Sequence, residues 1–320
     1  SAFFLFGAAL LYGFAGSSDL RVIAAAISTT SSDFDGLLVP GVVLVLIGLL
    51  FKVGAVPFHS WTPDVYQGAP TPITGFMAAC TKLAAFGVIL RVTYVGVSAS
   101  RWDWSDGLWA IAAITMVVGA VLSVTQTDVK RLLAYSSIAH AGFILVGVLA
   151  FSQAAIGGVM FYLVAYGFAT VAAFGIIAMV RQGGSEASHL SQWAGLGRRH
   201  PVVAGAFSFL LLAFAGIPLT SGFTAKFAAF APAVEAGTGG VVLVVIAVLA
   251  SAVTAFVYVR LIVLMYFTEA STEEGDEVVA LTPSIPSTIG ITVGVLVTAV
   301  LGIVPGFLLD IASSASEFLL

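Results

Sequence analysis

Charged residues are scarce in this chain of 320 residues. Asp, Glu, Lys and Arg make up 9% of the chain, whereas hydrophobic residues make up 60%. A soluble domain is about 25% charged, so this chain has too few charges to cover a surface that faces water. Its mean hydropathy of +1.10 points the same way. These values exclude an ordinary soluble protein and predict an all-α polytopic membrane protein.

Cysteine and the short motifs of cofactor sites are nearly absent too. A single cysteine, Cys80, excludes an internal disulfide, and its apolar neighbours predict a small residue buried in the core. There is no GxxxxGK[ST], no GxGxxG after a strand, no CxxC pair and no metal-ligating cluster in the sequence. The 12 Lys and Arg residues are scattered, so we expect no nucleic-acid partner. We also expect no metal, cofactor or redox site in this chain.

Long hydrophobic runs are abundant, and a membrane helix requires about 20 such residues. The five tryptophans lie near the ends of these runs, as an interfacial aromatic belt requires. The chain begins inside an apolar run, so we expect an incomplete first helix and a missing N-terminal part. The nine predicted membrane helices are 1–16, 37–67, 72–97, 107–127, 131–150, 154–181, 201–233, 240–267 and 285–310.

Basic residues between these helices indicate an orientation. Counted along the chain, the even-numbered connections hold five of them, and the odd-numbered connections and their edges hold three: Lys130, Arg131, Arg181, Arg198 and Arg199, against Arg21, Arg91 and Arg101. Connections rich in Lys and Arg remain cytoplasmic. We therefore predict cytoplasmic even-numbered loops and a C-terminus on the outside. The acidic cluster Glu273–Glu277 is expected to be a solvated loop.

Three lysines lie inside apolar helices, at Lys52, Lys82 and Lys226. A lysine at this depth costs several kcal/mol unless it meets a partner or water, so such a residue is a functional candidate. The alternative is that each long side chain extends to the membrane surface. Lys130 is expected to be a cytoplasmic anchor, with a place in a proton path as the weaker reading.

Two of these lysines accompany residues that interrupt helices. The interrupting residues are Gly54 and Pro57 after Lys52, and Gly216, Pro218 and Gly222 before Lys226. Proline removes a helix hydrogen bond, and irregular backbone inside a membrane must be buried in protein or line a watery cavity. The two helices are five apart in order and therefore run in opposite directions. This pattern indicates an inverted-repeat transporter; the alternative is two unrelated proline kinks.

Histidine and carboxylate positions complete the set of candidates. His140 lies mid-helix, and the ordinary histidine pKa near 6.5 suits a proton relay, although a packing role is equally open. His59 belongs to the first helix break, with a weaker part in proton transfer. No Asp or Glu lies mid-span, although deep lysines usually pair with carboxylates. We hypothesise that the missing N-terminal part supplies the acidic partner of Lys52.

Three motifs identify a resemblance that extends over almost the whole chain. They are FKVGAVPFHSWTPDVYQGAPTPITGFMAACTKLAAFGVILR (51–91), TDVKRLLAYSSIAHAGF (127–143) and LAFAGIPLTSGFTAKF (212–227). The chain resembles the antiporter-like membrane subunits of proton-pumping NADH:quinone oxidoreductase (respiratory complex I). Lys82 and Lys226, in their local motifs, match subunit N better than its two sister subunits. Subunits of multi-subunit sodium/proton antiporters are related as well.

The resemblance implies a fold, a function and partners. It implies one transmembrane domain over 1–320, with the end of a first repeat in 1–97, a second inverted repeat in 107–267 and a final helix in 285–310. It also implies a proton-translocating subunit in a bacterial plasma (inner) membrane, with other membrane-arm subunits, sister subunits among them, and lipid as partners. Flavin, iron–sulfur clusters, NADH and quinone are expected in other subunits, so the enzyme activity belongs to the complex.

The expected mechanism is a polar axis of Lys52, Lys82 and Lys226 with His140 between the halves, driven by quinone reduction elsewhere. Desolvation favours neutral lysine and a nearby carboxylate favours charged lysine, so moving a partner or water switches the charge. Lys226 would govern the outward exit. Alternatives are a sodium/proton antiporter subunit, a structural subunit that conducts nothing, and a transporter of small solutes.

Overall fold

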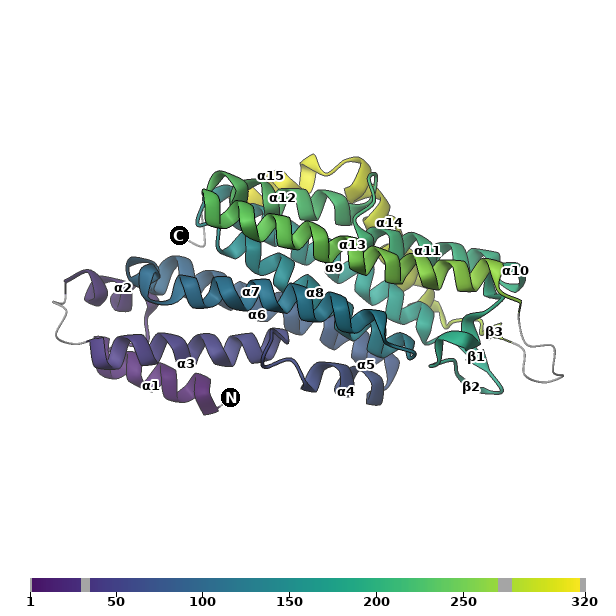
Figure 1. The fold of residues 1–320 in the computed structure, drawn as a ribbon, viewed down its shortest axis with the longest axis horizontal. Helices are drawn as coiled ribbons and strands as arrows, with labels where there is room; N and C mark the ends of the chain where they lie inside the picture. The colour runs from purple at the N-terminus through teal and green to yellow at the C-terminus, as the bar shows by residue number, and fades with distance from the viewer. Residues whose placement is uncertain (1, 30–34, 270–277, 317–320) are drawn as a thin grey trace.

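The computed structural model describes residues 2–29, 35–269 and 278–316, and the acidic cluster Glu273–Glu277 lies outside them. The described chain is mostly helical, and the helices run along its long axis (Figure 1). The longer helices are α1 (Ala2–Ala15), α2 (Leu20–Thr29), α3 (Asp35–Val53), α7 (Arg101–Val124), α8 (Val129–Val148), α9 (Gln153–Ile177), α11 (Pro201–Ala215), α12 (Ser221–Glu235), α13 (Thr238–Phe267), α14 (Ile285–Ile303) and α15 (Gly306–Ser316). The shorter elements are α4 (Trp61–Gly68), α5 (Thr71–Phe76), α6 (Lys82–Arg91), α10 (Leu196–Arg199), β1 (Val180–Gln182), β2 (Ser185–Glu186) and β3 (Val279–Ala280).

Seven stretches of the described chain are long and apolar enough to cross a membrane, and they coincide with seven of the nine predicted helices. The predicted helix over 201–233 is divided into the short helices α11 and α12. The first predicted helix is α1, which continues through a bend of 53° into α2. The connection expected over 17–36 is therefore partly helical, because Leu20–Thr29 is apolar enough to form a helix.

Helix α8 lies at the centre of the bundle. Of its membrane-spanning window 89% is buried, compared with 17% for α14. Helices α7, α9, α12 and α4 all pack against α8. Its apolar residues therefore point in every direction, which is the pattern of a helix surrounded by protein. Any polar side chain on α8 must find its partner inside the bundle.

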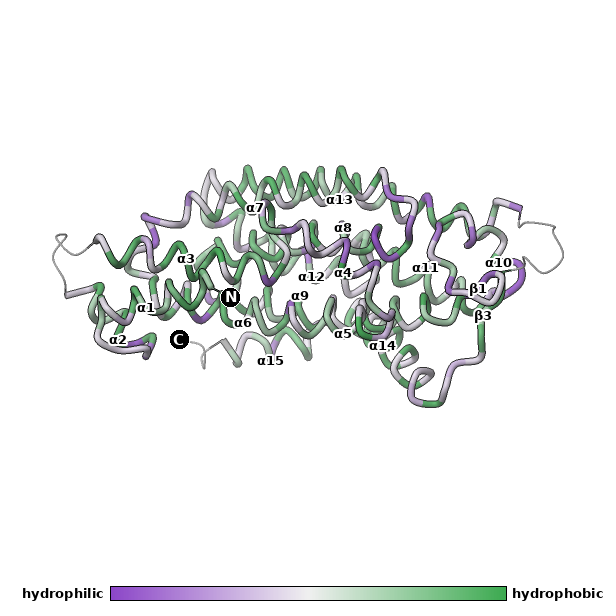
Figure 2. The backbone as a smooth tube through the Cα atoms, turned by 90° about the horizontal axis from the view of Figure 1, so that it is seen from below, coloured by the Kyte–Doolittle hydropathy of each residue, from purple (hydrophilic) through white to green (hydrophobic). Residues whose placement is uncertain are grey.

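The even-numbered connections gather at one end of the molecule, where hydrophilic segments surround β1 and α10 (Figure 2). They contain a small antiparallel sheet of order β2-β1-β3, with Arg181 opposite Glu186 and Val180 opposite Ala280. An isolated bridge joins Asp128 to His189. The prediction treated these connections as plain loops. They pair because exposed backbone between helix ends must find hydrogen-bond partners.

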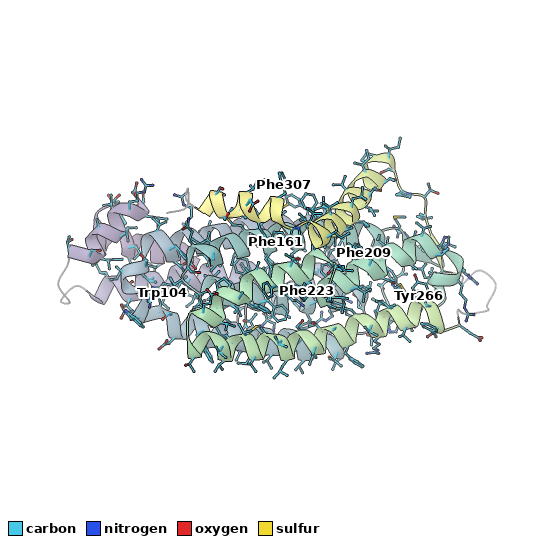
Figure 3. All side chains as sticks on the ribbon, turned by 90° about the horizontal axis from the view of Figure 1, so that it is seen from above. Trp104, Phe161, Phe209, Phe223, Tyr266 and Phe307 are labelled. Carbon is cyan, nitrogen blue, oxygen red and sulfur yellow. The ribbon has the colours of Figure 1, made fainter. Side chains whose placement is uncertain are left out.

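The outer surface carries two further corrections. The last predicted helix, 285–310, ends at Ile303, and the chain then turns at Pro305 into α15, which packs on α9. Helices α14 and α15 lie on the outside of the bundle, and Phe307 of α15 is 72% exposed (Figure 3). Cys80, predicted to be buried, is exposed on the surface of the chain because its helix presents that face outward.

Candidate functional site

The first break separates α3 from α4 and lies where the sequence predicted it. Gly54 has φ +76°, a left-handed conformation that glycine adopts without strain, and Pro57 follows a cis peptide bond. The break satisfies its own backbone: the Trp61 indole donates to the Phe51 carbonyl at 2.8 Å, and the Val56 amide donates to the Thr115 hydroxyl at 3.0 Å. Irregular backbone is thus stabilised inside the bundle by side chains of α4 and α7.

The second break separates α11 from α12, and a lysine closes it. Gly216 ends α11 with φ +84°. The Nζ atom of Lys226, on α12, donates to the carbonyls of Phe214 and Ala215 at 3.0 and 2.8 Å. It also donates to the Ser251 hydroxyl of α13 at 2.6 Å. A cation at the carbonyl end of a helix is favoured by the helix dipole, so Lys226 is held by the break itself.

The two broken helices run in opposite directions through the bundle (Figure 1). Chain direction runs from α3 toward the even-connection end, and from α10 through α11 to α12 away from it. Close packing holds the second break together: Gly222 meets the Ala213 carbonyl so tightly that an added Cβ would overlap it. The prediction of two discontinuous helices is confirmed.

Lys82 is buried in the middle of the apolar run from α5 to Gly96. A π-helical turn, Met77–Thr81, directly precedes it, and such turns often occur at functional sites. Its Nζ donates to the carbonyl and hydroxyl of Ser137 at 2.5 and 2.6 Å, and lies 5.1 Å from the centre of the Tyr166 ring. Lys82 is therefore held by α8 and α9 rather than extending to the membrane surface.

His140, on the central helix α8, lies between the two buried lysines. Its ring is 4.8 Å from the Tyr166 ring, which contacts Lys82, and 5.5 Å from the Phe143 ring, which contacts Lys226. His140 Nδ1 is 2.8 Å from the Tyr162 hydroxyl. The exposed fractions of Lys82, Lys226 and His140 are 3%, 7% and 2%. The structure thus brings these three predicted residues into one buried cluster.

Four polar residues of the cluster, on α9 and α13, were missed by sequence reasoning: Tyr162, Tyr166, Ser251 and Tyr258. The Tyr258 hydroxyl bonds to the Ser136 hydroxyl and lies 3.5 Å from His140 Nε2. Ser251 and Tyr258 are seven residues apart on α13, so they lie on the same face of that helix. This spacing is visible in the sequence, but only packing shows that the face meets the lysines.

A small cavity of about 10 Å³ borders this cluster. Its wall includes His140, Tyr166, Phe214, Ser221 and Gly222, so it lies between the histidine and the second break. This volume is at the lower limit for a single water molecule. Ring contacts separate His140 from each lysine, and one water at this place would shorten the gap toward Lys226.

Lys130 is buried at the even-connection end and is not a simple surface anchor. Its Nζ lies 3.5 Å from a carboxylate oxygen of Glu186 on β2. It also donates to the Ala69 carbonyl at 3.1 Å and to the Thr71 hydroxyl at 3.2 Å. Thr71 donates a hydrogen bond to Glu186. Lys130 therefore connects α8 to the segment between α4 and α5, apart from the central cluster.

Lys52 and His59 are placed differently from the other candidates. Lys52 is the second-last residue of α3, next to the break, and its side chain is exposed in this chain. Among the described residues it has no hydrogen bond or ion pair. His59 is partly buried, and its Nδ1 is a buried atom without a hydrogen-bond partner in the described part of the chain. The structure does not bring either residue into the cluster of Lys82, His140 and Lys226.

The cluster consists of side chains whose amino and imidazole groups can bind and release protons. Within the described residues, Lys82 and Lys226 meet carbonyls, hydroxyls and aromatic faces but no carboxylate. Burial disfavours a charged lysine, and the surrounding acceptors favour it. No group of three or more metal-ligating side chains occurs in the part of the chain that the structure describes.

Two oppositely directed broken helices around a buried lysine and histidine cluster define an antiporter-like membrane protein. The chain belongs to the NADH:quinone oxidoreductase/Mrp antiporter transmembrane family, whose model matches residues 1–254. The family defines the class of protein, and curated relatives share more than half of the residues of this chain.

Two curated relatives illustrate that similarity. A protein of Streptomyces griseus named NADH-quinone oxidoreductase subunit N 3 is 56% identical over 99% of this chain and 58% of its own length. The NADH-quinone oxidoreductase subunit N of Salinispora arenicola is 57% identical over 99% of this chain and 62% of its own length. The chain thus spans about three fifths of the length of these relatives.

Solved structures share the fold. A chain of respiratory complex I from Thermus thermophilus, solved with bound aureothin, matches with a TM-score of 0.78 and 33% identity, over 97% of this chain and 65% of that one. A chain of the Mrp complex from Dietzia matches with a TM-score of 0.84 and 23% identity, over 99% of this chain and 65% of that one. The second likeness establishes the fold alone.

Proposed function

We propose that this chain is the proton-translocating part of subunit N in a proton-pumping NADH:quinone oxidoreductase. Protons move through the buried axis of Lys82, His140 and Lys226, and quinone reduction elsewhere in the complex supplies the energy. The observation that supports this most is the burial of two lysines on either side of a histidine, each held by neutral acceptors. The names and the high identity of the curated relatives favour this complex over other assemblies.

The proposal assigns a different role to each lysine. Lys226 is held at the carbonyl end of α11, so a shift of α12 or α13 would change how well its charge is stabilised. His140 carries an imidazole, which can bind and release a proton, and it lies between the lysines. Lys226 governs the outward exit, and Lys82 receives the proton from the first half of the subunit.

Lys52 has the first-half role in this scheme. Its exposed side chain lies on a face that the described residues leave uncovered. An acidic side chain from outside this chain pairs with Lys52, and protonation of that pair is passed to Lys82. Residues 1–97 end the first repeat, 107–267 form the inverted second repeat, and α14 is the final membrane-spanning helix. His59 and Lys130 have weaker roles, beside the first break and at the even-connection end.

The remaining assignments follow the same proposal. The even-numbered connections, with the paired strands and Lys130, are cytoplasmic, and the protein lies in a bacterial plasma membrane. Its partners are the other membrane-arm subunits, including sister antiporter-like subunits. Flavin, iron–sulfur clusters, NADH and quinone bind to other subunits, so the translocase reaction belongs to the complex.

Acidification of inverted membrane vesicles driven by NADH tests the proposal. We expect Lys82→Met and Lys226→Met to lower the protons moved per NADH, or to lower pumping and NADH oxidation together, in a complex that still assembles. Lys82→Arg should fail as well, because arginine keeps its proton. Arg91→Gln, an exposed residue at the other end of α6, is the matched control and should pump normally.

Three outcomes would contradict the proposal. Normal pumping by both methionine variants would mean a structural subunit that conducts nothing. Proton movement that depends on added sodium rather than NADH would favour the sodium/proton antiporter, which has the same fold. Full activity of Lys82→Arg with none in Lys82→Met would mean that the charge matters and proton transfer through Lys82 does not.

A further inference from the structure

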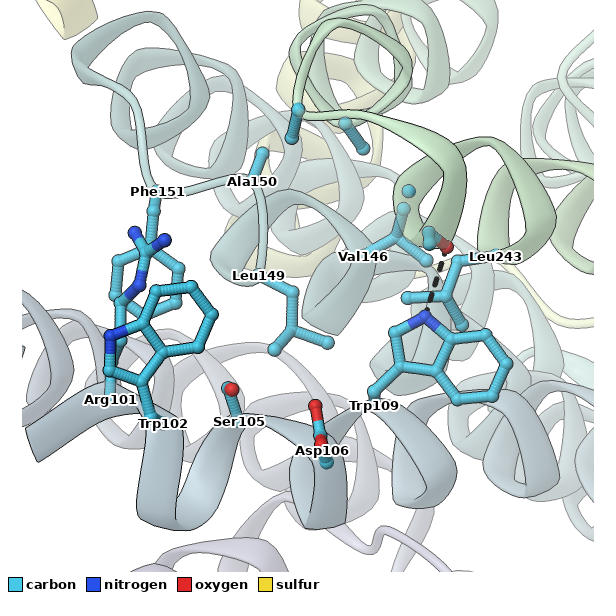
Figure 4. A pocket seen from close by; sticks show the side chains of 14 residues that line it. Arg101, Trp102, Ser105, Asp106, Trp109, Val146, Leu149, Ala150, Phe151 and Leu243 are labelled. Atoms are coloured by element: carbon cyan, nitrogen blue, oxygen red, sulfur yellow. Dashed lines mark hydrogen bonds between the residues drawn. The ribbon is translucent and has the colours of Figure 1, made fainter.

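A pocket of about 350 Å³ lies at the odd-connection end of the molecule and shares no lining residue with the lysine cluster; its lining side chains are drawn in Figure 4. One wall is the first part of α7. The opposite wall comes from the end of α8, the turn after it, the end of α12 and the start of α13. Trp102 and Trp109 line this pocket, which places it at the aromatic belt where lipid headgroups lie.

One end of the pocket holds an arginine on an aromatic platform. The Arg101 guanidinium carbon lies 4.4 Å from the Trp102 ring centre and 5.5 Å from that of Phe151. Phe151 has φ +49°, a conformation that is strained for a residue with a large side chain, and its ring stacks on Tyr94 at 5.0 Å. Its contacts with the rings of Tyr94 and Trp104 hold Phe151 in this conformation, beneath the guanidinium.

Arg101 is positioned but not neutralised. No ion pair joins it to a carboxylate among the residues that the structure describes. Stacking occupies the faces of the guanidinium and leaves its N–H edges available. Such an edge binds phosphate oxygens in a fixed, two-pronged geometry.

A carboxylate lines the same pocket on the same helix. Asp106 is exposed and has no ion pair within the described ranges. It follows Arg101 by five residues, which is about 7.5 Å along the helix axis. The two charges do not neutralise each other by contact, so the pocket presents a cation at one place and an anion at another.

Apart from Ser105, the other side chains of the wall are apolar or aromatic. Leu149 and Leu243 lie between the charged residues and the bundle (Figure 4). The Trp109 indole donates to the Gly239 carbonyl at 2.9 Å, which fixes the ring against the start of α13. A ligand in this pocket therefore needs a negative group, a positive group and an apolar part.

We propose that this pocket binds the headgroup of phosphatidylethanolamine. The lipid phosphate accepts hydrogen bonds from Arg101, the ammonium group binds Asp106, and the glycerol and upper acyl carbons lie against Leu149, Leu243 and Trp109. An anionic lipid meets the Asp106 carboxylate without a compensating charge. Free phosphate leaves the carboxylate and the apolar wall without a partner.

Lipid counting on the intact complex tests this site. The complete protein is purified with its natural assembly, stripped of loosely held lipid, and titrated with phosphatidylethanolamine, phosphatidylglycerol or inorganic phosphate while native mass spectrometry counts the bound molecules. We expect Arg101→Gln to lose one tightly held phosphatidylethanolamine, with affinity falling about tenfold or more. Arg91→Gln and Asp103→Asn, an exposed arginine and an exposed aspartate outside the pocket, should keep it.

The charge pattern provides a second measurement. Asp106→Asn should reduce the preference for phosphatidylethanolamine over phosphatidylglycerol by about tenfold while phosphate binding at Arg101 persists. Equal lipid counts in the wild type and in Arg101→Gln would overturn the proposal and mean that a protein segment covers the pocket. Preference for phosphatidylglycerol in the wild type, or retention of inorganic phosphate only, would overturn it as well.

Discussion

The two helix breaks contain similar residues, but different side chains bind the backbone carbonyls that each break leaves free. Each has a left-handed glycine, a proline and a lysine. At the second break, Lys226 itself donates hydrogen bonds to the freed carbonyls. It can do so because it belongs to α12, the half-helix after the break, and its side chain points back to α11. At the first break, the Trp61 indole donates to a freed carbonyl. Lys52 belongs to α3, the half-helix before the break, and its side chain is exposed.

This difference shows that a lysine near a broken helix is not yet a proton site. What matters is whether its ammonium group donates hydrogen bonds to the broken backbone. Lys226 cannot lose its proton without weakening the bonds that close α11, so its charge is coupled to the geometry of α12 and α13. Lys52 has no such coupling within the described residues, and its role depends on what covers its face.

The largest expected effect comes from the tight contact of the second break. Gly222→Ala should cost about 3 kcal/mol or more, because the added methyl overlaps the Ala213 carbonyl and backbone must move. We expect little assembled complex and a large fall in its melting temperature. Gly87→Ala, on α6 with open space around it, is the matched control and should be tolerated.

Gly54→Ala measures the same effect at the first break. It should cost about 1–2 kcal/mol, the penalty for a left-handed residue with a Cβ, plus the displacement of the Thr62 hydroxyl. If Gly54→Ala proved as damaging as Gly222→Ala, the two breaks would be equally rigid, and the contrast between them would be lost.

A smaller effect is expected when a partner of Lys226 is removed. Ser251→Ala should lower the free energy of unfolding by about 2 kcal/mol, because one hydrogen bond from a charged group is lost. It should also lower the number of protons moved per NADH oxidised. Vesicle acidification and melting of the purified complex measure both. Ser208→Ala removes a buried hydroxyl that has no hydrogen-bond partner among the described residues, so it should stabilise or leave the complex unchanged.

The smallest effect should come from the first break, where the Thr115 hydroxyl accepts a hydrogen bond from the Val56 amide and makes none with a lysine among the described residues. Thr115→Val keeps the shape of the side chain but leaves the Val56 amide unpaired, at a cost of about 1–2 kcal/mol. The melting temperature should fall while protons per NADH stay normal. Thr125→Val, at an exposed turn, is the control. A loss of pumping in Thr115→Val without loss of stability would connect the first break directly to proton transfer.

Much of this architecture could be predicted because a membrane helix is recognised from one continuous hydrophobic stretch of sequence. Hydrophobic length marked seven spans, and Gly54, Pro57, Gly216 and Pro218 marked both breaks. The depth of Lys82 and Lys226 inside apolar runs could be read from the sequence, but their burial against other helices could not. Cys80 and Lys130 were misjudged, because hydropathy tells how deep a residue lies along a helix but not which way it faces.

The sequence alone determined the class of protein, the positions of the broken helices and which lysines lie deep, since each depends on a contiguous run of residues. Only the tertiary structure decided which side chains meet. Ser137, Tyr166 and Ser251 come from three helices distant in sequence, and they hold Lys82 and Lys226 because α8, α9 and α13 pack around them. Hydrophobic burial has no direction, whereas hydrogen bonds to a buried ammonium require particular atoms within about 3 Å, and packing alone brings those atoms there.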